Sequence, residues 1–423
     1  MEHLEISKEI REMAARATQD VQPAFDRIDR IAAENAEKVL AAFRNNRVSD
    51  SCFAGTTGYG YDDKGREVLD SIYAEVFGTQ RALVRSGLVN GTHAITAALF
   101  SAVRPGDTLL SATGLPYDTL QSAIGISGDY PGSLKYYGIN YGQVDLTPEG
   151  RPDYEAIAAA AADKKVTAVE VQRSRGYSSR PAFTVEEIGR ICEIVHRVNP
   201  NAAVIVDNCY GEFTETVEPT QVGADLMAGS LIKNPGGGIA PMGGYIAGKA
   251  ELVEAASYRM TSPGIGGECG ATLGNNRLMF QGFFMAPHTT AQALKTAVFC
   301  ARMMELLGFE SAPGWAEPRT DIIQTVSLKS PEMMSLFCRG IQAGAPVDSF
   351  VTPEPWEMPG YDCPVIMAAG AFVQGASIEL SADGPVREPY TVYMQGGLTF
   401  ESARLGIMLA ADMLKSKQGG FLK

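Results

Sequence analysis

Residues 224–238 read Ala-Asp-Leu-Met-Ala-Gly-Ser-Leu-Ile-Lys-Asn-Pro-Gly-Gly-Gly. Lys233 lies there between an apolar, strand-like run and a glycine-rich loop, which is a poor position for an ordinary surface charge. Upstream, Ala203-Val-Ile-Val-Asp207 predicts a buried parallel strand that ends in a carboxylate. Open α/β sheets bind their ligands at the carboxyl ends of such strands. An amine and a carboxylate at neighbouring strand ends predict a site for pyridoxal 5'-phosphate (PLP).

The chemistry of PLP needs both residues. A lysine amine holds the cofactor as a Schiff base, and an acidic partner keeps the pyridine nitrogen protonated so that the ring can withdraw electrons. We therefore assign Lys233 as the attachment lysine, Asp207 as the acidic partner and the hydroxyl of Ser230 as a phosphate ligand. Taken alone, Asp207 could simply cap the next segment and Lys233 could be a solvated loop lysine. The three residues in this order favour the cofactor site.

Composition predicts an ordinary cytoplasmic enzyme. The chain has 423 residues, more than one hydrophobic core usually supports, so two domains are expected. Hydrophobic residues make up 45% and charged residues 20%, which is typical of a globular protein. The net charge is −13 and no cluster of lysine or arginine interrupts it, which argues against binding to nucleic acid or to an anionic membrane.

Targeting and metal-binding patterns are not found in the sequence. The first residues lack the basic start and apolar core of a signal peptide, and nowhere do 18 apolar residues run together. The seven cysteines are scattered without a Cys-x-x-Cys pair, and the four histidines have no ligand spacing. We expect reduced thiols, no metal and a cytoplasmic location.

The pattern of elements predicts three segments. Residues 1–48 form a helical arm, residues 49–288 a large α/β domain that binds PLP, and residues 289–423 a linking helix and a smaller α+β domain. In the large domain strands alternate with helices, so its sheet is mainly parallel; the strand near 244–247 follows Lys233 too closely for a helical crossover and should run antiparallel. Strand patterns are present at 82–85, 107–111, 135–137, 166–172, 203–207, 225–229, 244–247, 322–328 and 376–380.

Two further segments supply candidates for the cofactor site. Asn90, Gly91 and Thr92 open a predicted helix, whose free backbone N–H groups would cradle a phosphate. Taken alone, that segment is equally consistent with a helix merely capped by Asn90 or Thr92. Tyr117 follows a strand and could stack on the pyridine ring, which also makes it a catalytic candidate, or it could be a core tyrosine at a helix start.

Three arginines and two tyrosines complete the candidates. Arg173 and Arg175 follow the strand at 166–172, and either guanidinium matches a carboxylate or phosphate. In the small domain Arg387 could bind an amino-acid carboxylate, although Arg404 competes for that role. Tyr59 and Tyr61 lie in a glycine- and tyrosine-rich loop, from which they could bind cofactor across a subunit interface.

Together these motifs resemble the methionine γ-lyase-related family, also known as aluminium-resistance proteins. The resemblance runs in order from about residue 50 to 410. It rests on Gly-Tyr-Gly-Tyr-Asp-Asp-x-Gly-Arg, Gly-Thr-His-Ala-Ile, Pro-Tyr-Asp-Thr-Leu, Gln-Arg-Ser-Arg-Gly-Tyr-Ser, Val-Asp-Asn-Cys-Tyr-Gly-Glu-Phe, Ser-Leu-Ile-Lys-Asn-Pro-Gly-Gly-Gly and Gln-Gly-Gly-Leu-Thr-Phe-Glu.

The resemblance implies a fold-type-I PLP-dependent transferase, similar to aspartate aminotransferase. Such a fold has a seven-stranded, mainly parallel sheet with a smaller C-terminal α+β domain, and forms a homodimer or homotetramer with shared active sites. It also implies that Lys233 carries the cofactor, that Asp207 pairs with the pyridinium, and that Ser230 and the Gly91–Thr92 turn bind its phosphate. Tyr59 or Tyr61 would come from the second subunit.

The expected function is a carbon–sulfur lyase that acts on a sulfur-containing amino acid, by an elimination like those of cystathionine β- or γ-lyase or methionine γ-lyase. Residues that form the substrate carbanion do not fix its fate. An aminotransferase, a racemase or a replacement synthase therefore remains open, as does a PLP-binding, stress-related protein with little turnover.

Overall fold

The computed structural model describes residues 3–358 and 363–420. It divides into two compact units. The first, here called the sheet unit, contains residues 34–286; the second, the terminal unit, joins residues 1–33 to residues 287–423. Two long helices, α2 (Gln22–Asn45) and α9 (Asn276–Leu306), contain the points of division.

The predicted helical arm of residues 1–48 is helical over most of its length and is divided between the two units. Helix α1 (Lys8–Asp20) and the first part of α2 belong to the terminal unit, where Phe25 packs edge-to-face on Phe400 with ring centroids 5.0 Å apart. The second part of α2 belongs to the sheet unit, where Val39 and Ala42 are buried in the core. A single apolar stripe along α2 therefore contributes to two cores.

The sheet unit is built on a seven-stranded sheet with the order β1-β7-β6-β5-β4-β2-β3. The pairs formed by β2 to β6 are parallel, and β7 is antiparallel to both β1 and β6. The predicted mainly parallel sheet, with its antiparallel strand after Lys233, is confirmed. The strands are β1 (Arg81–Arg85), β2 (Thr108–Ser111), β3 (Asn140–Gln143), β4 (Val166–Gln172), β5 (Ala203–Asp207), β6 (Leu226–Ser230) and β7 (Gly244–Gly248).

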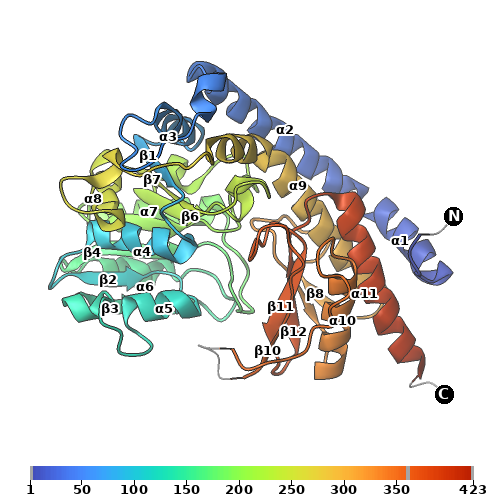
Figure 1. Ribbon diagram of the computed structural model, residues 1–423. Helices are drawn as coiled ribbons and strands as arrows, with labels where there is room; N and C mark the ends of the chain where they lie inside the picture. The colour runs from blue at the N-terminus through green and yellow to red at the C-terminus, as the bar shows by residue number, and fades with distance from the viewer. Residues whose placement is uncertain (1–2, 359–362, 421–423) are drawn as a thin grey trace. The chain divides into compact units, whose positions relative to one another are not determined.

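Helices cover both faces of this sheet (Figure 1). One apolar layer contains residues from α4 (Gly91–Ala102), α5 (Asp118–Ile124) and α8 (Ala250–Met260). The other contains residues from α3 (Lys64–Val76), α6 (Tyr154–Ala161) and α7 (Val185–Val198). Along β5, Val204 and Val206 face the second layer and Ile205 the first, so the strand is buried on both sides, as its unbroken apolar run predicts.

One predicted strand of the sheet unit is wrong. Lys135–Tyr137 forms a short 3-10 helix, η2, and the edge strand β3 begins at Asn140. Tyrosines favour strands, but here the ring of Tyr137 packs on the surface against Phe100, with centroids 5.8 Å apart. Gly138, at φ 79°, then turns the chain into β3.

The terminal unit has a five-stranded antiparallel sheet with the order β10-β11-β12-β9-β8 and the helices α10 and α11. Its strands are β8 (Glu310–Ala312), β9 (Gln324–Ser327), β10 (Val365–Ala368), β11 (Ser381–Pro385) and β12 (Thr391–Gln395). Its C-terminal helices are α10 (Pro331–Ala343) and α11 (Phe400–Gly420). The predicted strand at 376–380 is wrong, because that segment is a buried loop whose Glu379 carboxylate accepts the N–H groups of Phe372 and Val373.

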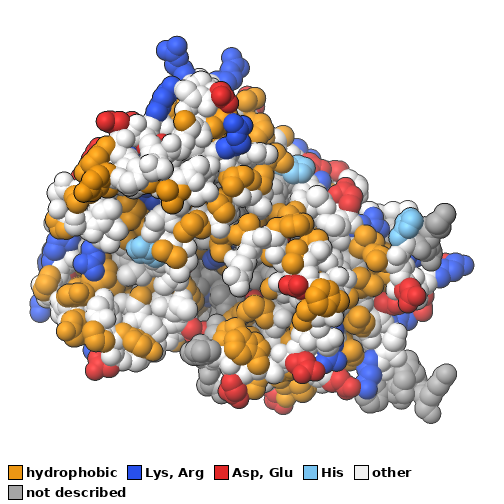
Figure 2. Space-filling view, viewed as in Figure 1, with side chains coloured by type: hydrophobic (Ala, Val, Ile, Leu, Met, Phe, Trp, Pro, Cys, Tyr) orange, Lys and Arg blue, Asp and Glu red, His pale blue; other side chains and the backbone are white. Residues whose placement is uncertain are grey.

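The described residues contain no helix long and apolar enough to cross a membrane. Within that same part of the chain, no three side chains of histidine, cysteine, aspartate or glutamate gather to hold a metal ion. In Figure 2, lysine and arginine side chains stand singly or in small groups among acidic, polar and apolar ones. This scatter is in keeping with the net charge of −13.

Candidate active site

Lys233 and Asp207 lie at the carboxyl ends of neighbouring parallel strands. Asp207 ends β5, is paired in register with Ala228 of β6 and is 4% exposed. Lys233 follows three residues after the end of β6. Burial raises the pKa of Asp207, while the nearby ammonium of Lys233 opposes that rise, so the two groups are close enough to influence each other's charge. The structure thus brings the predicted amine and carboxylate together.

The loop that carries Lys233 is held at both ends and at its tip. Leu231 donates its N–H to the carbonyl of Gly243 over 2.9 Å, which closes the loop where β6 and β7 begin to pair. At the tip, a Cβ on Gly237 would lie 2.3 Å from the carbonyl oxygen of Gly282 in α9. Only glycine allows this approach of two backbones.

The predicted phosphate cradle is the N-terminus of α4. Asn90 caps this helix, because its Oδ1 accepts the N–H of His93 at 2.8 Å. A Cβ on Gly91 would lie 3.3 Å from Cβ of Ser230 and 3.4 Å from Sγ of Cys209, so the helix begins directly against the end of β6. The N–H groups of Gly91 and Thr92 have no partner within the helix. These N–H groups and the Ser230 hydroxyl are donors of the kind that bind an anion, and their role in phosphate binding stays a prediction.

Tyr117 lies beside this cradle, immediately before α5. Its hydroxyl is hydrogen-bonded to Oγ1 of Thr92 at 3.2 Å, and its N–H is donated to Oε1 of Gln172 at 2.9 Å. Burial raises the pKa of the Tyr117 hydroxyl, and the Asp207 carboxylate raises it further. Tyr117 therefore stays a neutral phenol and a proton donor. Stacking of its ring on a pyridine ring stays a prediction.

A turn that was not predicted as part of the site follows Asp207. Asn234, next to Lys233, donates its Nδ2 to the carbonyls of Tyr210 at 3.0 Å and Glu212 at 2.9 Å. The backbone of Tyr210 is left-handed, with φ 71°, an uncommon conformation for a residue other than glycine. Nζ of Lys233 lies 3.9 Å from the centroid of the Tyr210 ring. The only hint in the sequence is that these residues follow a strand end within a few positions.

Arg173 is held by side chains of the turn after β5. Its side chain is wholly buried and bonds to Asn208 at 2.8 Å and Glu215 at 2.8 Å, with Glu218 3.6 Å away. Protein carboxylates neutralise this guanidinium, which holds the turn after β5. The substrate role of Arg173 stays a prediction.

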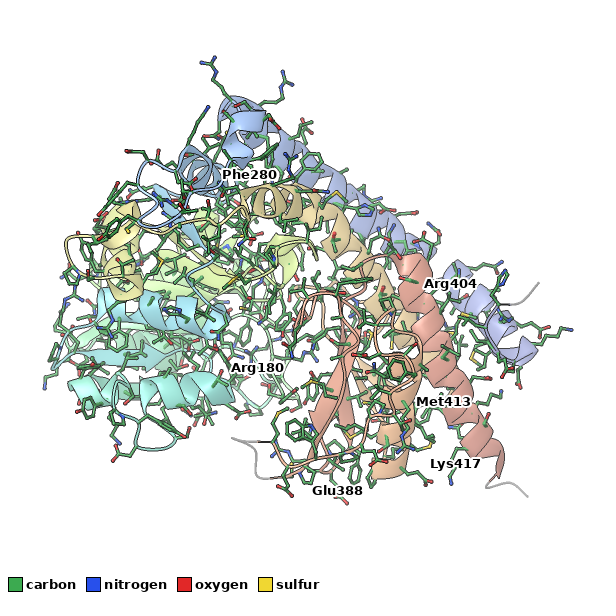
Figure 3. The ribbon with its side chains drawn as sticks, in the orientation of Figure 1. Arg180, Phe280, Glu388, Arg404, Met413 and Lys417 are labelled. Carbon is green, nitrogen blue, oxygen red and sulfur yellow. The ribbon has the colours of Figure 1, made fainter. Side chains whose placement is uncertain are left out.

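Of the other arginines near the end of β4, one is buried and one is half-buried. Arg175 lies in the loop after β4 and is 3% exposed, and its substrate role stays a prediction. Arg180, labelled in Figure 3, was not predicted. Its Nη2 donates to the carbonyls of Gln172 and Ser174, at 2.8 and 2.6 Å, and its charge lowers the pKa of Asp207 against the larger effect of burial.

Tyr59 and Tyr61 lie in a loop before α3 that is held by hydrogen bonds, here called the braced loop. They are 75% and 54% exposed, and their rings stack with centroids 5.8 Å apart. Arg66 donates to the carbonyl of Gly60, and the Asp63 carboxylate accepts the hydroxyls of Thr56 and Thr272. The loop is thus fixed while its two aromatic rings are open to solvent. Their predicted role in cofactor binding stays a prediction.

Arg387 belongs to the terminal unit. It is exposed in the turn between β11 and β12, next to Glu388, which Figure 3 labels. Its competitor Arg404 lies on α11, with its guanidinium 5.7 Å from the ring centroids of Phe299 and Phe400. A carboxylate-binding role for Arg387 stays a prediction.

Glu212 is a buried acid close enough to Lys233 for the lysine charge to lower its pKa against the larger effect of burial. Its Oε1 accepts the hydroxyl of Tyr245 at 2.8 Å, and a Cβ on Gly229 would lie 2.5 Å from the same oxygen. Burial raises the pKa of Glu212 to about 8, above the ordinary value of 4.5. The folded protein therefore holds this proton to a higher pH than the unfolded chain does.

The raised pKa of Glu212 contributes to the free energy of unfolding. This contribution should be complete below pH 4.5 and be lost as the pH rises to about 8. Glu212→Gln keeps an acceptor for Tyr245 and removes the titration. Between pH 5 and 8, we expect the free energy of unfolding of the wild type to fall relative to this variant by at most about 4 kcal/mol. Urea unfolding at the two pH values measures this. Parallel curves for the two proteins would show that Glu212 is ionised in the fold.

Comparison with known proteins places the chain in a family. The methionine gamma-lyase family model matches residues 10–415. The chain belongs to this family. One relative is the uncharacterized protein YnbB of Bacillus subtilis (strain 168). It is 53% identical over 410 residues, which cover 97% of each chain.

Solved structures agree with this membership in the methionine gamma-lyase family. A structure named as a carbon-sulfur lyase involved in aluminum resistance, from Clostridium novyi NT, is 52% identical, with a TM-score of 0.93 over 96% of each chain. The pyridoxal-5'-phosphate dependent protein YhfS from Escherichia coli is 17% identical, with a TM-score of 0.60 over 90% of this chain and 95% of its own. The predicted family and the fold-type-I architecture are confirmed.

Proposed function

We propose that the protein is a PLP-dependent carbon–sulfur lyase that acts on a sulfur-containing amino acid. The observation that carries the proposal is the grouping of the Lys233 amine, the Asp207 carboxylate and the N-terminus of α4 at one edge of the sheet. These three groups match the three parts of the cofactor: its aldehyde, its pyridine nitrogen and its phosphate. The raised pKa of Asp207 supports the fit, because a pyridinium would supply the cation that a buried carboxylate needs.

Each residue has a distinct task in this proposal. PLP, when bound, supplies an electron-withdrawing ring that stabilises negative charge on the α-carbon of an amino acid. Asp207 would keep the ring nitrogen protonated, while Gly91, Thr92 and Ser230 would hold the phosphate. Nζ of Lys233 would accept the α-proton, and the Tyr117 hydroxyl, which burial keeps protonated, would donate to the leaving sulfur.

Family membership and the name of the Clostridium novyi relative favour cleavage of a carbon–sulfur bond over other PLP reactions. The test is an absorbance spectrum of the purified protein followed by addition of L-cystathionine, L-cysteine or L-methionine. A band that changes with one of them, together with release of keto acid and ammonia, is the expected result. Amino transfer to an added keto acid without sulfur release would contradict lyase activity, and a protein unable to take up PLP would contradict the cofactor.

A second copy of the chain would complete this site in the proposed enzyme. The support is the braced loop that presents Tyr59 and Tyr61, whose stacked rings are more exposed than is usual for aromatic side chains of a fixed segment. In a symmetric dimer the same loop of each copy would reach the cofactor of the other.

Mixing two inactive variants tests this sharing. Lys233→Ala would remove the reacting amine, and the double variant Tyr59→Ala, Tyr61→Ala would remove the donated rings. Random pairing after unfolding and refolding of the mixture gives half hybrids with one intact site of two, so activity should recover to about a quarter of wild type. Each variant refolded alone is the control. Hybrids that form but stay inactive would contradict sharing.

A further inference from the structure

Tyr210 has a contact with Lys233 that the proposed function does not use. Nζ of Lys233 lies 3.9 Å from the centroid of the Tyr210 ring, well within the range of about 6 Å in which a cation is attracted to an aromatic face. We propose that the Tyr210 ring is a seat for the Lys233 ammonium and positions the protonated amine. The inference rests on the proposed function only in taking Lys233 as the reacting amine.

The backbone that carries the Tyr210 ring is fixed by hydrogen bonds. The left-handed conformation of Tyr210 is held on one side by Asn234, which donates to its carbonyl and immediately follows Lys233. On the other side Gly211 donates its N–H to Asn208, whose Oδ1 is bound by the buried Arg173. The backbones at Tyr210 and Asn234 are therefore anchored to each other, and the ring can leave the lysine only by rotation of its own side chain.

Four other groups act on the charge of Lys233. Asp207 ends β5, and Cys209 and Glu212 lie in the turn after it, which also contains Tyr210; Tyr117 immediately precedes α5. Burial lowers the pKa of Lys233, yet the acidic groups around it leave that pKa raised. At neutral pH, burial keeps Cys209, Tyr117 and Glu212 largely protonated. Asp207 acts on Lys233 alike in the wild type and in a Tyr210 variant without cofactor. The ring face attracts the ammonium without being ionised.

The consequence concerns proton transfer. When Lys233 takes the α-proton of an amino acid, the C–H bond breaks, its electron pair stays with the substrate carbon, and a new N–H bond forms on Nζ. The product of this step is an ammonium. A ring that stabilises the ammonium therefore favours lysine as the base, while it disfavours the neutral amine that attacks an electrophile.

The test is trace acetylation of the cofactor-free full-length protein with acetic anhydride over a range of pH, with modification at Lys233 read by mass spectrometry. Only the neutral amine reacts. Tyr210→Leu should label about tenfold faster than wild type at a fixed pH below the midpoint, with the midpoint at lower pH. Leucine is unbranched at Cβ, as tyrosine is, so the left-handed backbone is equally strained in both. Tyr210→Phe keeps the ring and should stay within about twofold of wild type.

Tyr154→Leu is the matched control, because it removes a similar contact, with the Arg190 guanidinium 4.0 Å from the Tyr154 ring on α6 and α7. It should leave Lys233 labelling unchanged. Equal labelling of Tyr210→Leu and wild type would overturn the proposal, as would a Tyr210→Phe that behaves like Tyr210→Leu. Because no cofactor is present, these results do not depend on whether the protein proves to be a lyase.

Discussion

Replacing Lys233 with alanine should abolish the absorbance band at roughly 420 nm that is expected of PLP joined to a lysine. The lysine is the amine held at the edge of the sheet beside Asp207, and alanine cannot form the bond. The phosphate site at Gly91, Thr92 and Ser230 would remain, so the variant should still bind some cofactor non-covalently. Absorbance spectra before and after reduction with borohydride measure this, because reduction fixes only a covalently bound cofactor.

Lys249→Ala is the control for this experiment. Lys249 lies after β7 and pairs with Asp225 at 2.7 Å at the start of β6, the opposite end of that strand from Ser230. Its loss should leave both the band and the reduced adduct intact. If Lys233→Ala keeps the band and is still fixed by borohydride, another lysine is the attachment point and the site proposed here is misplaced.

Asp207→Asn should leave PLP bound but slow exchange of the substrate α-proton by about a hundred to a thousandfold. Asparagine keeps an oxygen for the Cys209 N–H, which Asp207 Oδ1 accepts at 3.0 Å, so the local fold should survive. It cannot hold a proton on the pyridine nitrogen, because it carries no charge. Proton NMR in deuterium oxide, which follows the loss of the α-proton signal of an added amino acid, measures the rate.

Asp225→Asn separates this effect from a general effect of losing a buried carboxylate. Asp225 is 3% exposed in its side chain and binds His196 and Lys249. Its substitution should lower stability and leave the exchange rate per folded molecule nearly unchanged. A rate for Asp207→Asn equal to that of wild type would remove Asp207 from the proposed mechanism.

The elements that the sequence predicts well are those whose burial shows in the pattern. The β-branched apolar run before Asp207 is typical of a strand covered on both faces, and a parallel strand places its last residue at the ligand edge. Lys233 follows the next such strand, so the meeting of the two residues was predictable. The short link to β7 likewise left no room for a crossover helix, which fixes the direction of that strand.

Side-chain direction after a strand end is not encoded in the pattern. Arg173 follows β4 directly, but its guanidinium turns to Glu215 and Glu218, more than forty residues later in the chain. Tyr210, Glu212 and Asn234 join the site through a left-handed turn whose conformation depends on tertiary hydrogen bonds. The segment at 376–380 has strand-like burial, yet its Glu379 serves loop N–H groups. In each case a contact with residues distant in the sequence determines the side-chain direction or the local conformation.

The loop of Lys233 is closed by Leu231 and Gly243 and packed at Gly237 against α9. With its backbone fixed at three points, the lysine can reach different reactants only by rotation about the bonds of its own side chain. Side-chain rotations need no rearrangement of the loop, and loop rearrangements can take microseconds. Delivery of the amine should therefore not require loop movement, and we expect the slow step in bond breaking or in product escape.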